Sequence, residues 1–314
     1  MLPDDTLTGV RKGWASQTAM WVAALRGLAE LDEPRVVSDP LAVKLLPRGY
    51  RDLVAASKRS PRVSRALLVA AAKASKNLSR HLALRTRAID DVVVSEALNG
   101  TDQLVLLGAG FDARAWRLDQ LAKTTVFEID FPSTQRGKRE GIGDREPLAK
   151  HVTWAPIDFS KGEDVGAKRR WPRNGELEGR SPSNESDVAE VLERAGHDAK
   201  KRTTFVWEGV TMYLESDAID ATLASVSRAS APGSVVAITY HAKDIGWESV
   251  PLTVLVRVAG EPFKTRMSKA EARARLEKHG FRVETDEGSD DWSERYLRQP
   301  GYRDGERLVV ARKT

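Results

Sequence analysis

The first hundred residues carry apolar side chains at helical spacing. One stripe ends at Pro34, and a second is closed by Asn99-Gly100. An alanine-rich segment, 63–74, lies between them. The apolar positions are Trp14, Trp21, Val22, Leu25 and Leu28 in the first stripe, and Leu82, Ile89, Val92 and Val93 in the second. The pattern therefore predicts a helical N-terminal region.

From Leu104 the pattern changes to short apolar runs separated by helical stretches. Such runs are typical of buried parallel strands, with helices on both faces of the sheet. The five runs are Leu104–Leu107, Thr125–Ile129, His151–Ile157, Thr204–Trp207 and Val235–Tyr240. Two later runs, Phe281–Glu284 and Arg307–Ala311, are separated by a segment without helical period and predict an antiparallel pair at the sheet edge. The predicted fold is α/β, doubly wound, with a mainly parallel sheet.

The domain organisation follows from these changes of pattern. Residues 1–100 are predicted as a helical cap within the same domain as a core at 101–314. Residues 161–202 are poor in apolar side chains and contain two prolines and several glycines, which predicts a surface insertion. The stretch 245–263 is rich in apolar residues, and we expect a lid over about 241–266.

Composition narrows the functional classes. The 314 residues are 41% hydrophobic and include no apolar run of the roughly 20 residues that a membrane span needs. No cysteine is present and the five histidines show no ligand spacing, so no metal is expected. The net charge is +5, but the basic clusters Lys168-Arg169-Arg170 and Lys200-Lys201-Arg202 contain no aromatic residues, which disfavours nucleic acid as partner. A cytoplasmic protein that acts on a small molecule is expected.

A glycine turn follows the first predicted strand. Gly108-x-Gly110-x-x-Ala113 satisfies the dinucleotide fingerprint, in which glycines let the backbone approach a ligand closely. About 20 residues later the second run ends at Asp130, where a carboxylate can accept hydrogen bonds from ribose hydroxyls. This motif fits NAD and S-adenosylmethionine equally well.

Three further features favour S-adenosylmethionine. A long helical segment precedes the first strand, whereas a dinucleotide-binding domain often begins near its glycine turn. The last two runs suit the reversed hairpin that closes methyltransferase sheets. Asp158 and Phe159 follow the third run, where a carboxylate can accept from the adenine amine and a backbone N–H can reach a ring nitrogen. The sequence therefore favours a class I (Rossmann-like) methyltransferase with a seven-stranded sheet.

Seven blocks of the chain carry a family resemblance. They are "SQTAMWVAALR" from Ser16, "SDPLA" from Ser38, "LALRTRAIDD" from Leu82, "LLGAGFDARAWRL" from Leu106, "VFEIDFP" from Val126, "IDF" from Ile157 and "WEGVTMYL" from Trp207. In these blocks the chain resembles the leucine carboxyl methyltransferase family, which includes bacterial S-adenosylmethionine-dependent O-methyltransferases. The resemblance implies methyl transfer to a carboxylate or hydroxyl of a small molecule, or to a protein carboxyl group.

The resemblance also implies roles for single residues. Arg85 matches the arginine that holds the methionine carboxylate, and Gly108 lies against the methionine part. Asp130 matches the ribose acid, and Glu208 an acid beside the cofactor. Asp158 and Phe159 match the pair at the adenine. Two departures are that relatives commonly have tyrosine at His81, and that a lysine near the N-terminus has no equivalent in "SQTAM".

Several other residues leave alternatives open. Asp112 is a helix cap or a functional acid; Arg114 and Arg117 form ion pairs or contact substrate; Trp116 and Trp207 are core residues or stack on the cofactor. Tyr213 either packs or contacts the acceptor. His241 is either a general base for a hydroxyl acceptor or an exposed loop histidine, and Tyr240 is expected to line the same pocket.

Two other functions share the glycine turn. An NAD-dependent oxidoreductase would need a proton-transferring tyrosine–lysine or histidine–acid pair, and no such motif is found. A non-catalytic S-adenosylmethionine sensor is the other alternative. The oligomeric state and the acceptor are not defined by the sequence.

Overall fold

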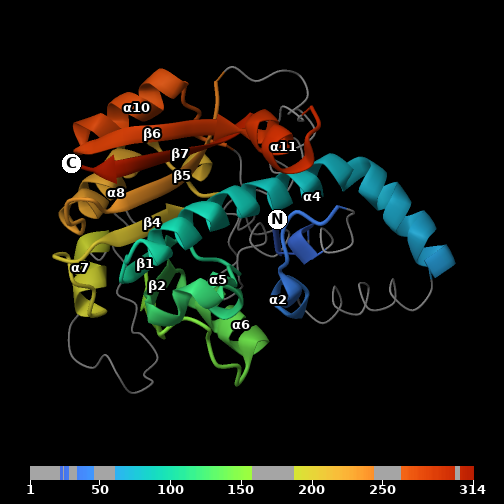
Figure 1. Ribbon diagram of the computed structural model, residues 1–314, viewed down its shortest axis with the longest axis horizontal. Coiled ribbons are helices and arrows are strands. Elements are labelled where there is room, and N and C mark those ends of the chain that lie inside the picture. Colours follow the sequence, from blue (N-terminus) through green and yellow to red (C-terminus); the bar gives the residue numbers. More distant parts are fainter. Residues whose placement is uncertain are drawn as a thin grey trace, which may run out of the picture.

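A seven-stranded sheet runs through the centre of the computed structural model (Figure 1). The structure describes residues 22–23, 25–27, 34–45, 61–157, 187–243, 263–300 and 305–314, with side chains of the long helix from residue 78 onward. The strands are β1 (Gln103–Leu107), β2 (Thr125–Asp130), β3 (His151–Pro156), β4 (Thr203–Trp207), β5 (Val235–His241), β6 (Phe281–Gly288) and β7 (Glu306–Lys313). Each of the seven apolar runs in the sequence forms one of these strands.

The strand order is β3-β2-β1-β4-β5-β7-β6. The five strands from β1 to β5 are parallel, and β7 lies antiparallel to both β5 and β6. The predicted doubly wound sheet with an antiparallel pair at its edge is confirmed. Because β7 runs in the opposite direction, its first residue, Glu306, pairs with His241, the last residue of β5. The start of β7 therefore lies at the same edge as the carboxyl ends of the parallel strands.

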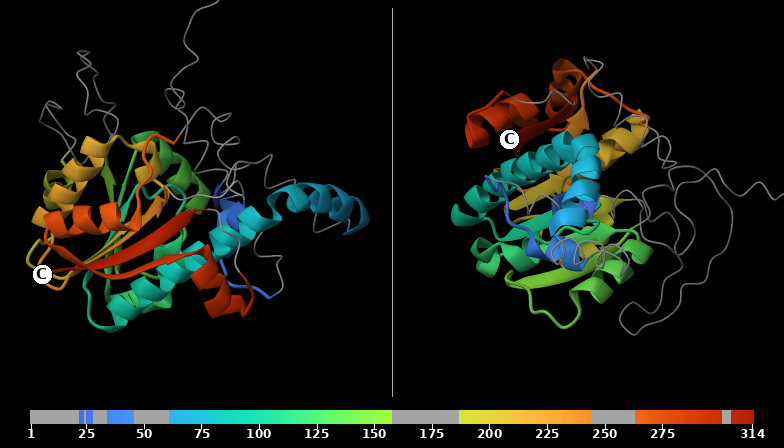
Figure 2. Two further views of the ribbon diagram at one scale, coloured as in Figure 1. Left: turned by 90° about the horizontal axis from the view of Figure 1, so that it is seen from above. Right: turned by 90° about the vertical axis from the view of Figure 1, so that its right-hand side faces the viewer.

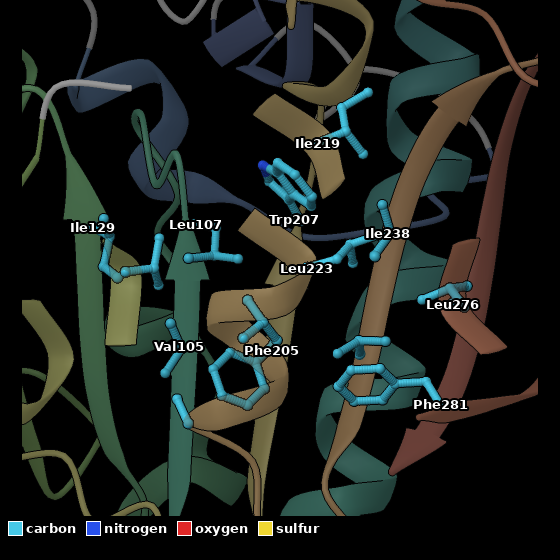
Figure 3. Close-up of a cluster of buried hydrophobic side chains, with 14 of the residues drawn as sticks. Val105, Leu107, Ile129, Phe205, Trp207, Ile219, Leu223, Ile238, Leu276 and Phe281 are labelled. Atoms are coloured by element: carbon cyan, nitrogen blue, oxygen red, sulfur yellow. The ribbon is translucent and has the colours of Figure 1, made fainter. Parts of the chain in front are cut away.

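Helices cover both faces of the sheet (Figures 1 and 2). One face packs on α7 (Val188–Arg194), α8 (Ser216–Arg228) and α10 (Lys269–Lys278). Figure 3 shows this apolar layer, in which Phe205 and Trp207 of β4 lie among side chains from β1, β5 and the helices. The opposite face packs on α4 (Pro61–Leu98), α5 (Arg114–Arg117), α6 (Pro132–Ile142) and α11 (Ser289–Leu297), with the 3-10 turn η1 (Asp119–Lys123).

The long helix α4 crosses the second face and continues beyond the sheet (Figure 2). It contains both the alanine-rich segment and the second apolar stripe of the sequence. Its buried side chains, among them Leu84, Ile89 and Val93, pack on β1 and β4. Arg85 and Asp90, which lie between them, are also buried, whereas Arg87 and Asp91 are exposed. This half of α4 therefore brings charged groups over the carboxyl ends of the strands.

Two helices lie where the sequence predicted none. The segment before β7 was expected to be a loop, which is wrong, because α11 occupies it. The Gly288 N–H donates to the Asp291 carboxylate at the start of this helix, and Trp292 is its one fully buried large side chain. A helix anchored by so few apolar residues shows no clear stripe. The second, α7, lies within the expected insertion and is capped by Asp187, which accepts from two backbone N–H groups.

Some sequence predictions fall outside the described residues. These include Trp14, Trp21 and Leu28 of the first stripe, most of the expected insertion, and 244–262 of the expected lid. Near the N-terminus the structure describes α2 (Pro40–Lys44), which lies against α6. No helix in the described part of the chain has the length and apolar character of a membrane span.

Gly108 provides a test of the turn after β1. Its φ is +68°, and a Cβ there would lie 2.5 Å from the Val210 Cγ2. We expect Gly108→Ala to lose about 1–2 kcal/mol for the backbone conformation and roughly 1–3 kcal/mol more for the clash. Urea unfolding of the variant measures the sum of these two losses. Gly196→Ala is the matched control, because φ is +87° there and the added methyl meets nothing within 4 Å. Equal losses in the two variants would contradict the close approach of Val210.

Candidate active site

The glycine turn after β1 is held against the end of β2. The N–H groups of Gly108 and Ala109 both donate to the Ile129 carbonyl, at 2.8 and 3.0 Å. The Gly110 N–H donates to Asp130 Oδ2 at 2.5 Å, and the Phe131 N–H donates to Oδ1 at 2.6 Å. Burial raises the pKa of Asp130, although these two hydrogen bonds act in the opposite direction. The predicted ribose acid is thus fixed beside the turn, and each oxygen keeps capacity to accept another hydrogen bond.

The turn does not lead into an open helix N-terminus. The helix α5 has only four residues, and its first N–H, from Arg114, donates to Asp112 Oδ1 at 2.7 Å. Asp112 therefore binds the first turn of this helix, as the capping alternative predicted. The Arg114 N–H is therefore not available to a ligand, because a carboxylate of the chain already accepts its hydrogen bond. A phosphate would meet a negative charge there.

A chain of alternating buried charges runs from the glycine turn to β4. Arg114, fully buried, donates from Nε to Asp90 at 2.7 Å and from Nη1 to Asp112 and to Glu208 Oε2, the latter at 2.8 Å. Arg117 donates to both oxygens of Asp90 at 2.6 Å. The ion-pair alternative for Arg114 and Arg117 is confirmed. Asp90, which the sequence assigned no role, lies between the two arginines on α4.

Arg85 continues this chain toward β7. Its Nε donates to Glu208 Oε1 at 3.0 Å, and its Nη2 lies 2.9 Å from the same oxygen. Its Nη1 lies 2.9 Å from each oxygen of Glu306. Arg85 of α4 and Glu208, which directly follows β4, were predicted as site residues, whereas Glu306 of β7 was not. Glu306 was missed because it immediately precedes the last apolar run, where a charged residue looks like a strand end.

The arginines keep these carboxylates ionised. Burial alone would raise the pKa of Glu208, but Arg114 and Arg85 lower it below its ordinary value. Burial likewise opposes ionisation of Asp112, yet Arg114 and other cations lower its pKa to about 2. Arg85 lowers the pKa of Glu306 well below its usual range, and His81 adds to this effect. The site therefore contains fixed negative charge at neutral pH.

Negative charge exceeds positive charge in this region. Five basic side chains, those of Arg26, Arg85, Arg114, Arg117 and Lys138, lie among seven carboxyl groups. The seven are Asp39, Asp90, Asp112, Glu128, Asp130, Glu208 and Glu306. Such surroundings favour a ligand of net positive charge and oppose a polyanionic one such as a pyrophosphate.

The rings of Tyr213 and His241 both lie against the ring of Phe263. The His241 ring lies 4.5 Å from that of Phe263, and the Tyr213 ring 5.7 Å, between centroids. Backbone hydrogen bonds from Lys264 and Thr265 to the Met212 carbonyl join these segments. The alternative of an exposed loop histidine is wrong, because His241 ends β5 and is 3% exposed.

The remaining candidates are Trp207, Trp116 and Tyr240. Trp207 is buried in the apolar layer of Figure 3, as its core alternative predicted. Trp116 is half-buried, and its ring lies 5.8 Å from that of Trp154. The expectation that Tyr240 shares a pocket with His241 is wrong, because successive strand residues face opposite sides and Tyr240 donates to Asp286 at 2.7 Å.

Asp158 and Phe159 lie outside the described residues. The described residues contain no cluster of three or more histidine or acidic side chains arranged to hold a metal ion.

The comparisons with known proteins show the family of the chain. A family model described as leucine carboxyl methyltransferase matches residues 19–168 and 183–227. The chain belongs to this family. A member from Mycobacterium avium (strain 104), with the provisional name S-adenosyl-L-methionine-dependent methyltransferase, is 32% identical over 233 residues, which cover 71% of this chain and 66% of that protein. This chain thus matches just under two thirds of that relative's length.

Two further proteins extend the comparison along the chain. A family member from Mycobacteroides abscessus with the same provisional name is 27% identical over 310 residues, 92% of this chain and 90% of that protein. A solved structure from Thermobifida fusca, provisionally named a methyltransferase, covers 96% of this chain and 99% of its own, with a TM-score of 0.57 and 13% identity. That structural likeness shows the fold, and it agrees with the class I sheet predicted from the sequence.

Arg114 allows a test of the buried charge chain. We expect Arg114→Met to lose about 3–5 kcal/mol of stability at pH 7, because three buried carboxylates lose their shared cation. In the wild type the lowered pKa of Asp112 contributes stability above its ordinary pKa of 3.8, and this is lost as the pH falls toward about 2. The variant lacks this contribution and gains relief from protonation, so the difference should be smaller at pH 4 than at pH 7.

Urea unfolding at the two pH values measures this difference. Arg87→Met is the control, because Arg87 pairs with Asp91 on the exposed side of α4. We expect that change to cost less than about 1 kcal/mol. A loss of similar size in the two variants would contradict the role of Arg114.

Proposed function

We propose that the protein is an S-adenosylmethionine-dependent O-methyltransferase acting on a small molecule. The observation that carries the proposal is the excess of carboxylates around the glycine turn, with Asp112 bonded to the first N–H of α5. S-adenosylmethionine carries a sulfonium and an ammonium group, and both suit this surrounding charge. The pyrophosphate of NAD would meet Asp112 where a dinucleotide fold offers free N–H groups. Membership of the leucine carboxyl methyltransferase family supports the same activity.

The described residues fit the proposed cofactor. The absence of a Cβ at Gly108 lets the turn approach Val210 closely, and Asp130 beside it would accept from the ribose hydroxyls. Arg85 would bind the methionine carboxylate, and Glu208 would lie near the cationic groups. Asp158 and Phe159 are proposed for the adenine. Methyl transfer from a sulfonium is an in-line displacement, and S-adenosylmethionine would supply the methyl group.

The chain's own contribution is orientation and exclusion of water. The ion pairs with Arg85 and Arg114 hold the Glu208 carboxylate in one position. A rigid carboxylate beside the cofactor would help to keep the reacting atoms in line. A carboxylate acceptor is already ionised at neutral pH and needs no base. A hydroxyl acceptor needs one within hydrogen-bond reach, and His241 is the proposed residue, with Tyr213 as a contact for the acceptor. We further propose that residues 1–100 cap the site and that 241–266 cover it.

Calorimetry with S-adenosylhomocysteine and, separately, NAD tests this function. We expect micromolar binding of S-adenosylhomocysteine and no binding of NAD. Asp130→Ala and Asp130→Asn should weaken S-adenosylhomocysteine by roughly 10- to 100-fold, because charge-assisted hydrogen bonds to the ribose are lost. Asp119→Ala changes an exposed aspartate at the start of η1 and should leave affinity unchanged. Binding of NAD alone would overturn the proposal and support the oxidoreductase alternative.

His241 distinguishes the two kinds of acceptor. Small carboxylic acids and phenols are offered with labelled S-adenosylmethionine, and alkaline hydrolysis separates methyl esters from methyl ethers. For a hydroxyl acceptor we expect His241→Gln to lower kcat about 100-fold or more, because the general base is lost. For a carboxylate acceptor the same variant should retain kcat. An ether product formed at full rate by His241→Gln would exclude His241 as the base.

A further inference from the structure

Glu306 is the least expected member of the buried charge chain. It is the first residue of β7, 3% exposed, and lies far in the sequence from the other charged residues of the site. Both of its oxygens lie 2.9 Å from Arg85 Nη1, and Oε2 also lies 2.7 Å from His81 Nε2. Burying a carboxylate costs free energy unless it is paired, so the contacts with Arg85 and His81 stabilise Glu306 at this buried position.

The two glutamates hold Arg85 on different edges of its guanidinium group. Glu208 contacts Nε and Nη2, whereas Glu306 contacts Nη1. Because the guanidinium is planar, contacts on two edges fix both its direction and its plane. With Glu208 alone, the group could still rotate about the bonds of its flexible side chain. Glu306 therefore supplies the second constraint.

Glu306 is itself held from both sides. His81, one helical turn before Arg85 on α4, contacts it, and the His81 ring lies 5.8 Å from the Trp292 ring of α11. On the sheet, Glu306 pairs with His241 across β5 and β7, so the two side chains face the same side. The arrangement joins α4, α11 and the antiparallel edge of the sheet at one carboxylate.

We propose that Glu306 is a positioning residue for cofactor binding, which acts by holding the Arg85 guanidinium ready for the carboxylate of the methionine group. This inference rests on the proposed function. Glu306 does not contact the transferred methyl group in this scheme. Its effect is confined to the amino-acid end of the ligand, because Arg85 is the group it holds.

The test compares two ligands by calorimetry. S-adenosylhomocysteine carries the amino-acid carboxylate, whereas 5′-methylthioadenosine keeps the adenosine and the thioether without it. We expect Glu306→Gln to weaken S-adenosylhomocysteine by roughly 10- to 100-fold, because the charged contact to Arg85 is lost. Binding of 5′-methylthioadenosine should change less than about twofold. A merely structural role would weaken both ligands together.

Further variants keep the test decisive. Glu284→Gln makes the same change on β6, where the glutamate pairs with Arg312, and should leave both affinities unchanged. Glu306→Asp keeps the charge and should recover part of the lost affinity. If Glu306→Gln fails to fold in a thermal scan, His81→Gln replaces it, since His81 contacts Glu306 directly. That variant should weaken S-adenosylhomocysteine selectively, by a smaller factor.

The outcomes separate this inference from the proposed function. A wild type that does not bind S-adenosylhomocysteine would overturn the proposed function. A wild type that binds it, with equal binding by Glu306→Gln, would overturn only the role of Glu306. Tighter binding by the variant would also overturn it, because Glu306 would then compete with the ligand carboxylate for Arg85.

Discussion

The buried chain of alternating charges is the interaction on which the site depends. Arg114 has no exposed surface and binds carboxylates from α4, from the glycine turn and from the end of β4. Removing either the guanidinium group or its carboxylate partners would leave unpaired charge in an interior of low polarity, which costs several kcal/mol. The chain therefore fixes the relative positions of these three elements, and Arg85 and Glu306 extend the same constraint to β7.

This charge arrangement separates the chain from dinucleotide-binding proteins with a similar glycine turn. In those proteins the turn leads into a helix whose free N–H groups face a phosphate. Here the helix α5 is one turn long. Asp112 accepts a hydrogen bond from the first N–H of α5, and Asp130 accepts one from the Gly110 N–H of the turn. A ligand at this place meets negative charge, which the arginines keep ionised by lowering the pKa of Asp112 and Glu208.

The long helix α4 connects the charge chain to the apolar core. Leu84, Ile89 and Val93 bury its apolar side on the sheet, while Arg85 and Asp90 enter the charge chain. The helix α11 packs beside it, and Tyr296 donates to Asp91 while Trp292 lies near His81. The apolar contacts therefore determine the depth of α4 on the sheet, and this depth lets the charged residues reach β4 and β7.

The sequence by itself determined the sheet and the family. Apolar runs marked all seven strands, most clearly β1, β4 and β5, because strands buried on both faces need continuous apolar residues. The blocks around Gly108, Asp130 and Glu208 predict cofactor-binding roles by resemblance, and these roles are proposals. Asp158 and Phe159 remain predictions on the same basis. The sequence also placed Arg114 in ion pairs, although it did not name Asp90 as a partner.

Only the tertiary structure decided which charges meet. Glu306 lies more than 200 residues from Arg85, and the antiparallel direction of β7 brings its first residue to the edge where the parallel strands end. The helix α11 was missed because its burial rests mainly on Trp292. Tyr240 faces away from His241, as alternation along a strand requires, but only the fold shows that its partner is Asp286 of β6. These contacts depend on long-range pairing, and local periodicity contains no information about it.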